Sequence, residues 1–177
     1  MLVVEKVVRA KAVKVGDNID TDVIIPGRYL IYTDPETLGK YCFEPIMPDF
    51  YKKSKELGGV IVVAGRNFGM GSSREQAVVA LKGAGVKAVV AESFARIFYR
   101  NCINQGLPAV RVPGISEAVE EGDEVEVDLE NGVVRVYDPQ GNLKKEFKVP
   151  KLPPSLLEIL ESGGLVPYLK RKMVQTQ

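Results

Sequence analysis

The most informative absence from this chain of 177 residues is histidine, which occurs at no position. Histidine is the commonest general base in enzymes and the commonest metal ligand, so neither role can depend on an imidazole here. Cysteine is scarce as well, with only Cys42 and Cys102, whereas a cubane iron–sulfur cluster generally takes four cysteine ligands. We therefore expect the chain to bind no metal ion and no such cluster on its own.

A surplus of either charge and a long apolar run are also missing. The chain has 24 basic and 23 acidic residues, a net charge of +1, which gives no support for binding nucleic acid or a membrane surface. No apolar run approaches the ~18 residues of a membrane-spanning helix, and the N-terminal MLVVEKVVRA lacks the form of a signal peptide. We expect a cytoplasmic protein whose two cysteines are reduced core residues.

What is present is enough apolar material, 45% of the residues, for one good core, so a single domain spanning residues 1–177 is expected. The strongest pattern lies at residues 59–112. An apolar run enters the loop GRNFGMG, and apolar residues at helical spacing follow it. A strand at 87–91, a helix at 94–105 and a strand at 107–112 come next. This alternation predicts an α/β fold with a mainly parallel sheet, flanking helices and ligands at the carboxyl ends of the strands.

The junction between the glycine loop and the first of these helices allows two interpretations. Ser72 can cap the helix, with Glu75 completing a capping box. Alternatively, the loop and the helix N-terminus bind an anion, which would explain Arg74 at a helical position where a cation opposes the helix dipole. The residues alone leave both interpretations open.

The same stretch carries a resemblance to a known family. GMGSSREQA at residues 69–77, SFARIF at 93–98 and GDNIDTDVIIPGRYL near the N-terminus resemble the small subunits of isopropylmalate isomerase and homoaconitase. These chains are equivalent to the mobile fourth domain of aconitase. The family motif usually reads G-x-G-S-S-R-E-H-A, so one of its specified positions differs here. The resemblance covers most of the first 112 residues.

The resemblance implies a swivelling domain and half of an active site. It implies a hydro-lyase of leucine biosynthesis that moves a hydroxyl between adjacent carbons of isopropylmalate by removing and restoring water. It assigns the catalytic base to Ser72 and a carboxylate clamp to Arg74, with Gly71 and Ser73 beside the substrate. A [4Fe–4S] cluster would belong to an aconitase-like large subunit, with which the chain would form a heterodimer or heterotetramer.

Two further segments are expected near the substrate because of the resemblance. Asp20 and Thr21 lie in the acidic loop DNIDTD, which lacks the glycine and glutamate of a calcium-binding loop and is expected to hydrogen-bond local backbone and shape the entry. Ile31 and Tyr32 lie in YLIYT, at the position where the family reads the variable group of the substrate. An aliphatic residue there accompanies isopropylmalate, and an arginine accompanies homoaconitate-type substrates.

Two departures from the family pattern keep other functions open. Gln76 stands where the family commonly has histidine, and Met70 where cysteine or glutamate is frequent. A related hydro-lyase acting on homoaconitate, citraconate or citramalate, or dimethylmalate is one alternative. A non-enzymatic module that holds an anion or nucleotide in the glycine loop is another, although the lysine of a phosphate-binding P-loop is missing.

Outside this central unit the sequence predicts simpler structure. A β-strand or bent strand pair is expected at residues 2–15, and short helices at 35–41, after Asp34 as N-cap, and at 48–55. From Glu121 an alternating pattern predicts a three-stranded antiparallel meander, with Asn131–Gly132 as a type I′ turn and a second turn at 138–142. Ser155 is expected to cap a helix that ends at 163–164, and a last short helix is expected at 166–173.

Overall fold

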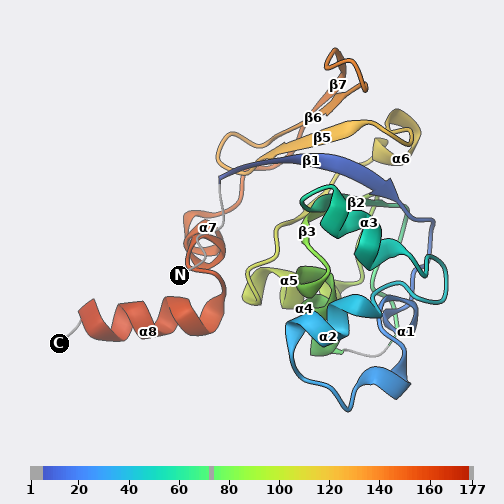
Figure 1. Ribbon diagram of the computed structural model, residues 1–177. Helices are drawn as coiled ribbons and strands as arrows, with labels where there is room; N and C mark the ends of the chain where they lie inside the picture. The colour runs from blue at the N-terminus through green and yellow to red at the C-terminus, as the bar shows by residue number, and fades with distance from the viewer. Residues whose placement is uncertain (1–5, 72–73, 176–177) are drawn as a thin grey trace.

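A computed structural model describes residues 6–71 and 74–175 of the chain. Its centre is a seven-stranded sheet in the order β4-β3-β2-β1-β5-β6-β7. Four neighbouring strands are parallel and the last three run antiparallel (Figure 1). The mixed α/β fold with a mainly parallel part and an antiparallel meander is confirmed. The strands are β1 (Val7–Lys14), β2 (Val60–Ala64), β3 (Val86–Ala91), β4 (Ala109–Arg111), β5 (Glu124–Asp128), β6 (Val133–Tyr137) and β7 (Leu143–Lys148).

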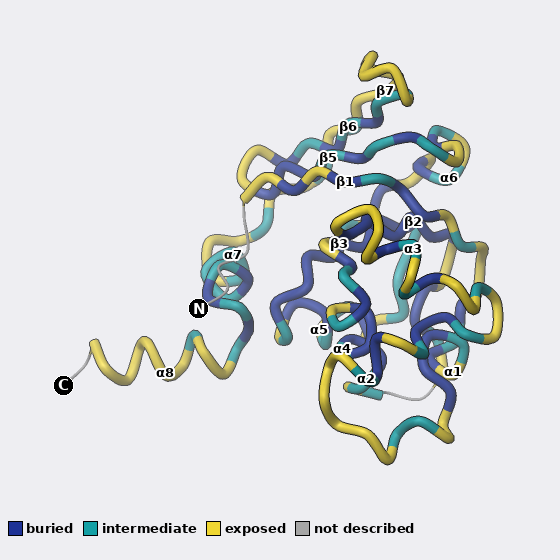
Figure 2. The backbone as a smooth tube through the Cα atoms, in the orientation of Figure 1, coloured by how far each residue is buried: buried dark blue, intermediate teal, exposed yellow. Residues whose placement is uncertain are grey.

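Burial explains why the parallel strands read as uninterrupted apolar runs. Every residue of β2 is buried, because helices cover one face of the sheet and the curled sheet itself, with α7, covers the other. β5 and β6 alternate between buried and half-buried residues, which is the pattern of a sheet with one wet face (Figure 2). The helical elements are α1 (Thr21–Ile24), η1 (Gly27–Tyr29), α2 (Pro35–Lys40), α3 (Phe50–Glu56), α4 (Glu75–Gly83), α5 (Arg96–Asn104), α6 (Ile115–Ala118), α7 (Pro154–Glu161) and α8 (Leu165–Gln175).

Two hydrophobic clusters lie on the two faces of this sheet. The first fills the space between the sheet and helices α1 to α5 and contains both cysteines, which are free and buried as expected. The second lies inside the curl of the sheet and is closed by residues of α6 and α7. Helix α8 extends away from the body of the domain in Figure 1.

Helices α2 and α4 cross at two glycines. A Cβ atom added to Gly39 would lie 2.4 Å from the carbonyl carbon of Gly83, and one added to Gly83 would lie 1.8 Å from the carbonyl oxygen of Pro35. No side chain fits at either position, so the two backbones are in direct contact. This contact fixes α2, which follows residues 30–34, against α4, which follows the glycine loop.

Three predicted turns and caps are wrong in detail. Helix α4 begins at Glu75, with Arg74 extended at the N-cap position, so the predicted helix start at Ser72 is too early. Helix α7 begins at Pro154 after Pro153 as N-cap, which places Ser155 inside the first turn. The 131–132 turn is not type I′, because only Gly132 has a positive φ; the backbone N–H of Asn131 instead donates to Asp128.

Candidate functional site

The candidate site lies where β1, β2 and β3 end at the same edge of the sheet. The loop after β2 is held by the loop after β1: the Asn18 N–H donates to the Arg66 carbonyl at 2.7 Å, and the Gly69 N–H donates to the Ile19 carbonyl at 2.8 Å. The loop after β3 holds it from the other side, where the Asn67 N–H donates to Ser93 Oγ at 2.8 Å. The glycine loop is therefore fixed between its two neighbours rather than free.

Glycine is required at two positions of this loop. Gly69 has φ +85°, and an added Cβ would lie 2.1 Å from the ring of Phe98. Gly71 has φ +95°, and an added Cβ would lie 2.7 Å from the carboxylate oxygens of Asp20. Both the backbone conformation and the close packing exclude larger residues, which explains the Gly-x-Gly spacing.

Arg74 follows this loop and is held by the segment after β1. Its Nη1 donates to Asp22 Oδ1 at 2.8 Å and to the Ile25 carbonyl at 3.3 Å. The same Asp22 oxygen accepts the Gly27 N–H at 3.1 Å. The hydrogen bond from Arg74, followed by the one from Gly27, lowers the pKa of Asp22, so this carboxylate stays ionised beside the guanidinium.

A cavity of about 190 Å³ opens beside Arg74. It brings together three residues named from the sequence, Thr21, Gly71 and Arg74, with Thr21 buried in its wall. The full lining is Thr21, Gly69, Gly71, Arg74, Ala95, Arg96, Ile97, Phe98 and Asn101. Two guanidinium groups, those of Arg74 and Arg96, at one small cavity suit a carboxylate ligand.

Asp20 supports the cavity without lining it. Its carboxylate is the N-cap of α1 and accepts the Asp22 N–H at 2.8 Å, which confirms that this acidic loop hydrogen-bonds local backbone. The adjoining Thr21 N–H donates to the Met70 carbonyl at 2.9 Å. Asp20 thus fixes the start of the segment that carries Asp22.

The remaining residues named from the sequence do not line this cavity or are not described. Ile31 is 79% exposed and Tyr32 is 38% exposed, and neither belongs to the cavity wall. The ring of Tyr32 stacks at 6.4 Å on Tyr41. Ser72 and Ser73 lie outside the described residues.

The sequence predicts that the loop containing Asp22 shapes the entry, but it does not predict the contact of Asp22 with Arg74 or the place of Arg96 and Asn101 in the cavity wall. The signal for Asp22 is its place in the DTD segment of the resemblance, but its pairing with Arg74 depends on a contact between distant parts of the chain. Arg96 and Asn101 belong to a predicted helix that the resemblance places beside the site, although structural or partner contacts are the expected use of most of its polar residues. The fold places both in the cavity wall.

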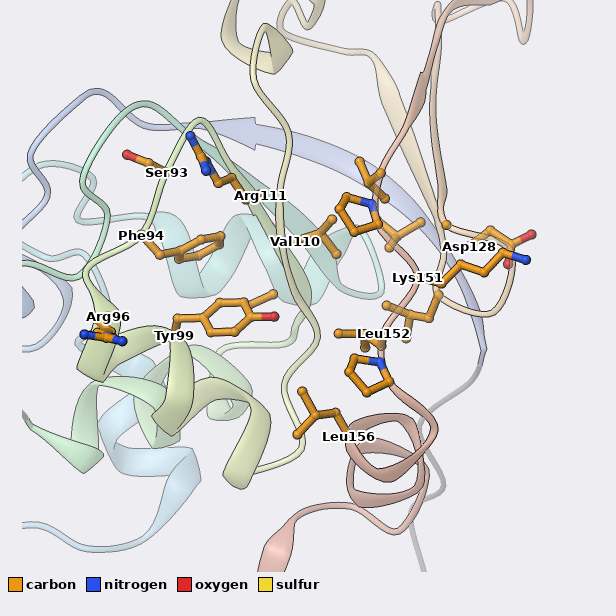
Figure 3. A pocket seen from close by; sticks show the side chains of 17 residues that line it. Ser93, Phe94, Arg96, Tyr99, Val110, Arg111, Asp128, Lys151, Leu152 and Leu156 are labelled. Atoms are coloured by element: carbon orange, nitrogen blue, oxygen red, sulfur yellow. The ribbon is translucent and has the colours of Figure 1, made fainter.

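A second, larger cavity of about 460 Å³ lies between α5 and β4 on one side and residues 149–156 on the other (Figure 3). Apolar side chains such as Phe94, Val110 and Leu152 make up much of its wall. It contains neither Arg74 nor Gly71, so we place the candidate site in the smaller cavity. Arg96 lines both cavities.

Two kinds of feature are absent from the part of the chain that the structure describes. Among residues 6–71 and 74–175, no three acidic or cysteine side chains are grouped as a metal ion would require. In the same ranges, no helix has the length and apolar character needed to cross a membrane.

Known proteins resemble the whole chain. A profile of the aconitase C-terminal domain family matches residues 40–114. The 3-isopropylmalate dehydratase small subunit of Sulfurisphaera tokodaii is 54% identical over 171 residues, 97% of this chain and 98% of that protein. The protein of the same description from Pyrobaculum calidifontis is 59% identical over 165 residues, 93% of this chain and 98% of that protein.

Two relatives come from Methanocaldococcus jannaschii. One is described as an isopropylmalate/citramalate isomerase small subunit and is 53% identical over 97% of this chain and 98% of that protein. The other is a crystal structure described as 3-isopropylmalate dehydratase, with a TM-score of 0.83, 46% identity and coverage of 96% of this chain and 98% of that chain. With identity this high over nearly the full length, the chain belongs to the family of 3-isopropylmalate dehydratase small subunits, within the aconitase superfamily.

Proposed function

We propose that this chain acts as the small subunit of a 3-isopropylmalate dehydratase, a hydro-lyase that interconverts 2-isopropylmalate and 3-isopropylmalate in the cytoplasm. The observation that carries the proposal is Arg74 at a small cavity on the glycine loop, held by Asp22 at 2.8 Å. Isopropylmalate carries two carboxylates, and an arginine fork suits one of them. This chain supplies one wall of the active site, and we assign the opposite wall to a large subunit.

The reaction removes water across two adjacent carbons and adds it back in the opposite sense. A base takes the proton from one carbon, the hydroxyl leaves the other as water, and an alkene forms between them. We assign the base to Ser72. Arg74 and Ser73 hold a carboxylate, and Gly71 offers its backbone beside them. Asp20 and Thr21 keep the neighbouring wall in place.

The residues of this chain do not fit an iron–sulfur cluster. The Cys42 and Cys102 thiols are both buried, and burial raises the pKa of each well above its usual range, so neither is available as a thiolate ligand. We therefore assign the expected [4Fe–4S] cluster, a Lewis acid for the departing hydroxyl, to the large subunit. The roles assigned to this chain involve only its own side chains and backbone.

The test is Ser72→Ala in a complex reconstituted with the large subunit. Turnover should fall by about a hundredfold or more, since removing a general base typically costs that much. Thermal unfolding of the variant should nearly match that of the wild type, because the helix begins at Glu75 with Arg74 as its N-cap. A variant with more than about a tenth of the wild-type rate would contradict the assignment.

Ile31 and Tyr32 are proposed to read the variable group of the substrate once the large subunit is bound. The exposed aliphatic side chain of Ile31 favours an isopropyl group over a carboxylate, whose charge would lose water without gaining a partner. Ile31→Arg should shift kcat/KM from isopropylmalate toward homoaconitate. An unchanged ratio would remove this support for isopropylmalate.

Citramalate is the second candidate substrate, favoured by the description of the Methanocaldococcus jannaschii relative. It carries a methyl group where isopropylmalate carries an isopropyl group. Comparing kcat/KM for the two substrates on the same reconstituted complex decides between a selective enzyme and one that accepts both.

A further inference from the structure

The charges around the smaller cavity are unevenly compensated. Arg74 is paired with the ionised carboxylate of Asp22 at 2.8 Å, so this pair contributes almost no net charge. The proposed substrate brings two negative charges to the same cavity. A paired Arg74 can orient one carboxylate, but it does not balance both.

Arg96 is the second guanidinium of the cavity wall, and it is not compensated. Among the described residues, no carboxylate lies within salt-bridge distance of it, and no hydrogen bond occupies its side chain. The residue is exposed and lines both cavities, and Figure 3 shows it among the residues of the larger one. Its charge is therefore available to a ligand.

Local stability does not account for an arginine at this position. Arg96 is the first residue of α5, which follows Ala95 as an N-cap without any side-chain capping bond. A cation in the first turn opposes the helix dipole. The same helix carries Arg100 about one turn further on, also exposed but outside both cavities.

We propose that Arg96 binds the second carboxylate of the substrate, so that the small subunit holds one carboxylate with Arg74 and the other with Arg96. This inference rests on the proposed function. Of the two arginines, Arg74 is held rigidly by protein groups and positions the reacting end of the substrate. Arg96 supplies the net positive charge that makes the site select dicarboxylates.

The experiment uses the complex reconstituted with the large subunit and compares wild type, Arg96→Gln, Arg96→Lys and the control Arg100→Gln. Arg96→Gln should raise KM for isopropylmalate by between about ten- and a hundredfold, the range expected for one charge-assisted hydrogen-bonded contact, with a smaller change in kcat. Arg96→Lys should recover part of the loss, and Arg100→Gln should behave as wild type.

Inhibition by a substrate analogue and its two monomethyl esters assigns the effect to a carboxylate. Isopropylsuccinate, which lacks the hydroxyl, keeps both carboxylates, and its monomethyl esters each keep one. Wild type should bind the diacid more tightly than either monoester, and in Arg96→Gln the difference should disappear for the monoester that lacks the carboxylate bound by Arg96. If Arg96→Gln weakens the binding of the diacid and of both monoesters by the same factor, the proposal is overturned.

Other outcomes separate this inference from the proposed function. If the wild-type complex turns over isopropylmalate while Arg96→Gln has the KM of Arg100→Gln, the inference fails and the function stands. If Arg96→Gln no longer co-elutes with the large subunit on size exclusion, Arg96 is a partner contact and the inference fails. If the wild-type complex has no activity on isopropylmalate, the proposed function itself is wrong.

Discussion

Two ion pairs, one in each half of the sheet, differ in what surrounds their carboxylates. In the parallel half, Asp22 pairs with Arg74 at 2.8 Å, and the Asp22 side chain is 62% exposed. In the antiparallel half, Asp123 pairs with Lys144 at 2.6 Å, and the Asp123 side chain is 2% exposed. Arg74 of the first pair lines a cavity, whereas the second pair ties the turn before β5 to β7. We infer that the first serves binding and the second stability.

The largest expected effect on stability comes from Asp123→Asn. The carboxylate accepts both Lys144 Nζ and the Glu120 N–H, so the variant loses a buried charged hydrogen bond, worth about 2 kcal/mol. The melting temperature should fall by several degrees, while activity per folded complex stays unchanged. Differential scanning calorimetry measures the first quantity, and the steady-state rate measures the second. A large loss of activity without a change in melting temperature would show that the Asp123–Lys144 pair does not serve stability.

Asp22→Asn should have the opposite effect, a change in KM with little change in the melting temperature. An asparagine keeps an oxygen that can accept from Arg74 and Gly27, and an exposed ion pair contributes at most about 1 kcal/mol, so the melting temperature should change little. Removing the negative charge frees the charge of Arg74 for the substrate, and KM should fall a few-fold. Asp22→Ala, which cannot hold Arg74, should raise KM instead. Steady-state kinetics on both variants decides this, and equal KM values would show that Asp22 does not control Arg74.

The smallest effects concern pH. Because the pKa of Asp22 is lowered on folding, its contribution is present above the ordinary value of 3.8 and is lost as pH falls through the lowered pKa. The hydrogen bond to Asp123 raises the pKa of Lys144, so its contribution is present below the ordinary 10.5 and is lost as pH rises through the raised value. Urea titrations over a range of pH measure the free energy of unfolding of wild type, Asp22→Asn and Lys144→Met. Asp22→Asn should lose less of this free energy than wild type as the pH falls, and Lys144→Met should lose less of it as the pH rises.

Much of the fold was predictable because its elements have strong local patterns. The uninterrupted run VIVVA predicted β2 since both faces of that strand are buried, and alternation predicted β5 and β6 since one face is wet. Asp34 was correctly identified as an N-cap, and its carboxylate accepts the Thr37 N–H at 2.9 Å. Such signals lie within a few residues of the structure that they predict.

The errors arose where distant contacts override local signals. Ser72 and Glu75 have the spacing of a capping box, yet Arg74 remains extended, with φ −103° and ψ 111°, while its side chain reaches Asp22 and Ile25. The cavity wall could not be fully predicted for the same reason. Arg96 lines the same cavity as Arg74, on a helix that packs Phe98 against Gly69 of the glycine loop.

The central place of β1 has a consequence for the order in which the chain can fold. β1 pairs with β2 on one side and with β5 on the other, and the contact between Arg9 and Glu124 spans 115 positions of sequence. The parallel half, complete at residue 111, can therefore assemble while the antiparallel half is still being synthesised. Until β5 arrives, one edge of β1 has unpaired backbone groups, which makes this interval the time at which the nascent subunit is most exposed to aggregation.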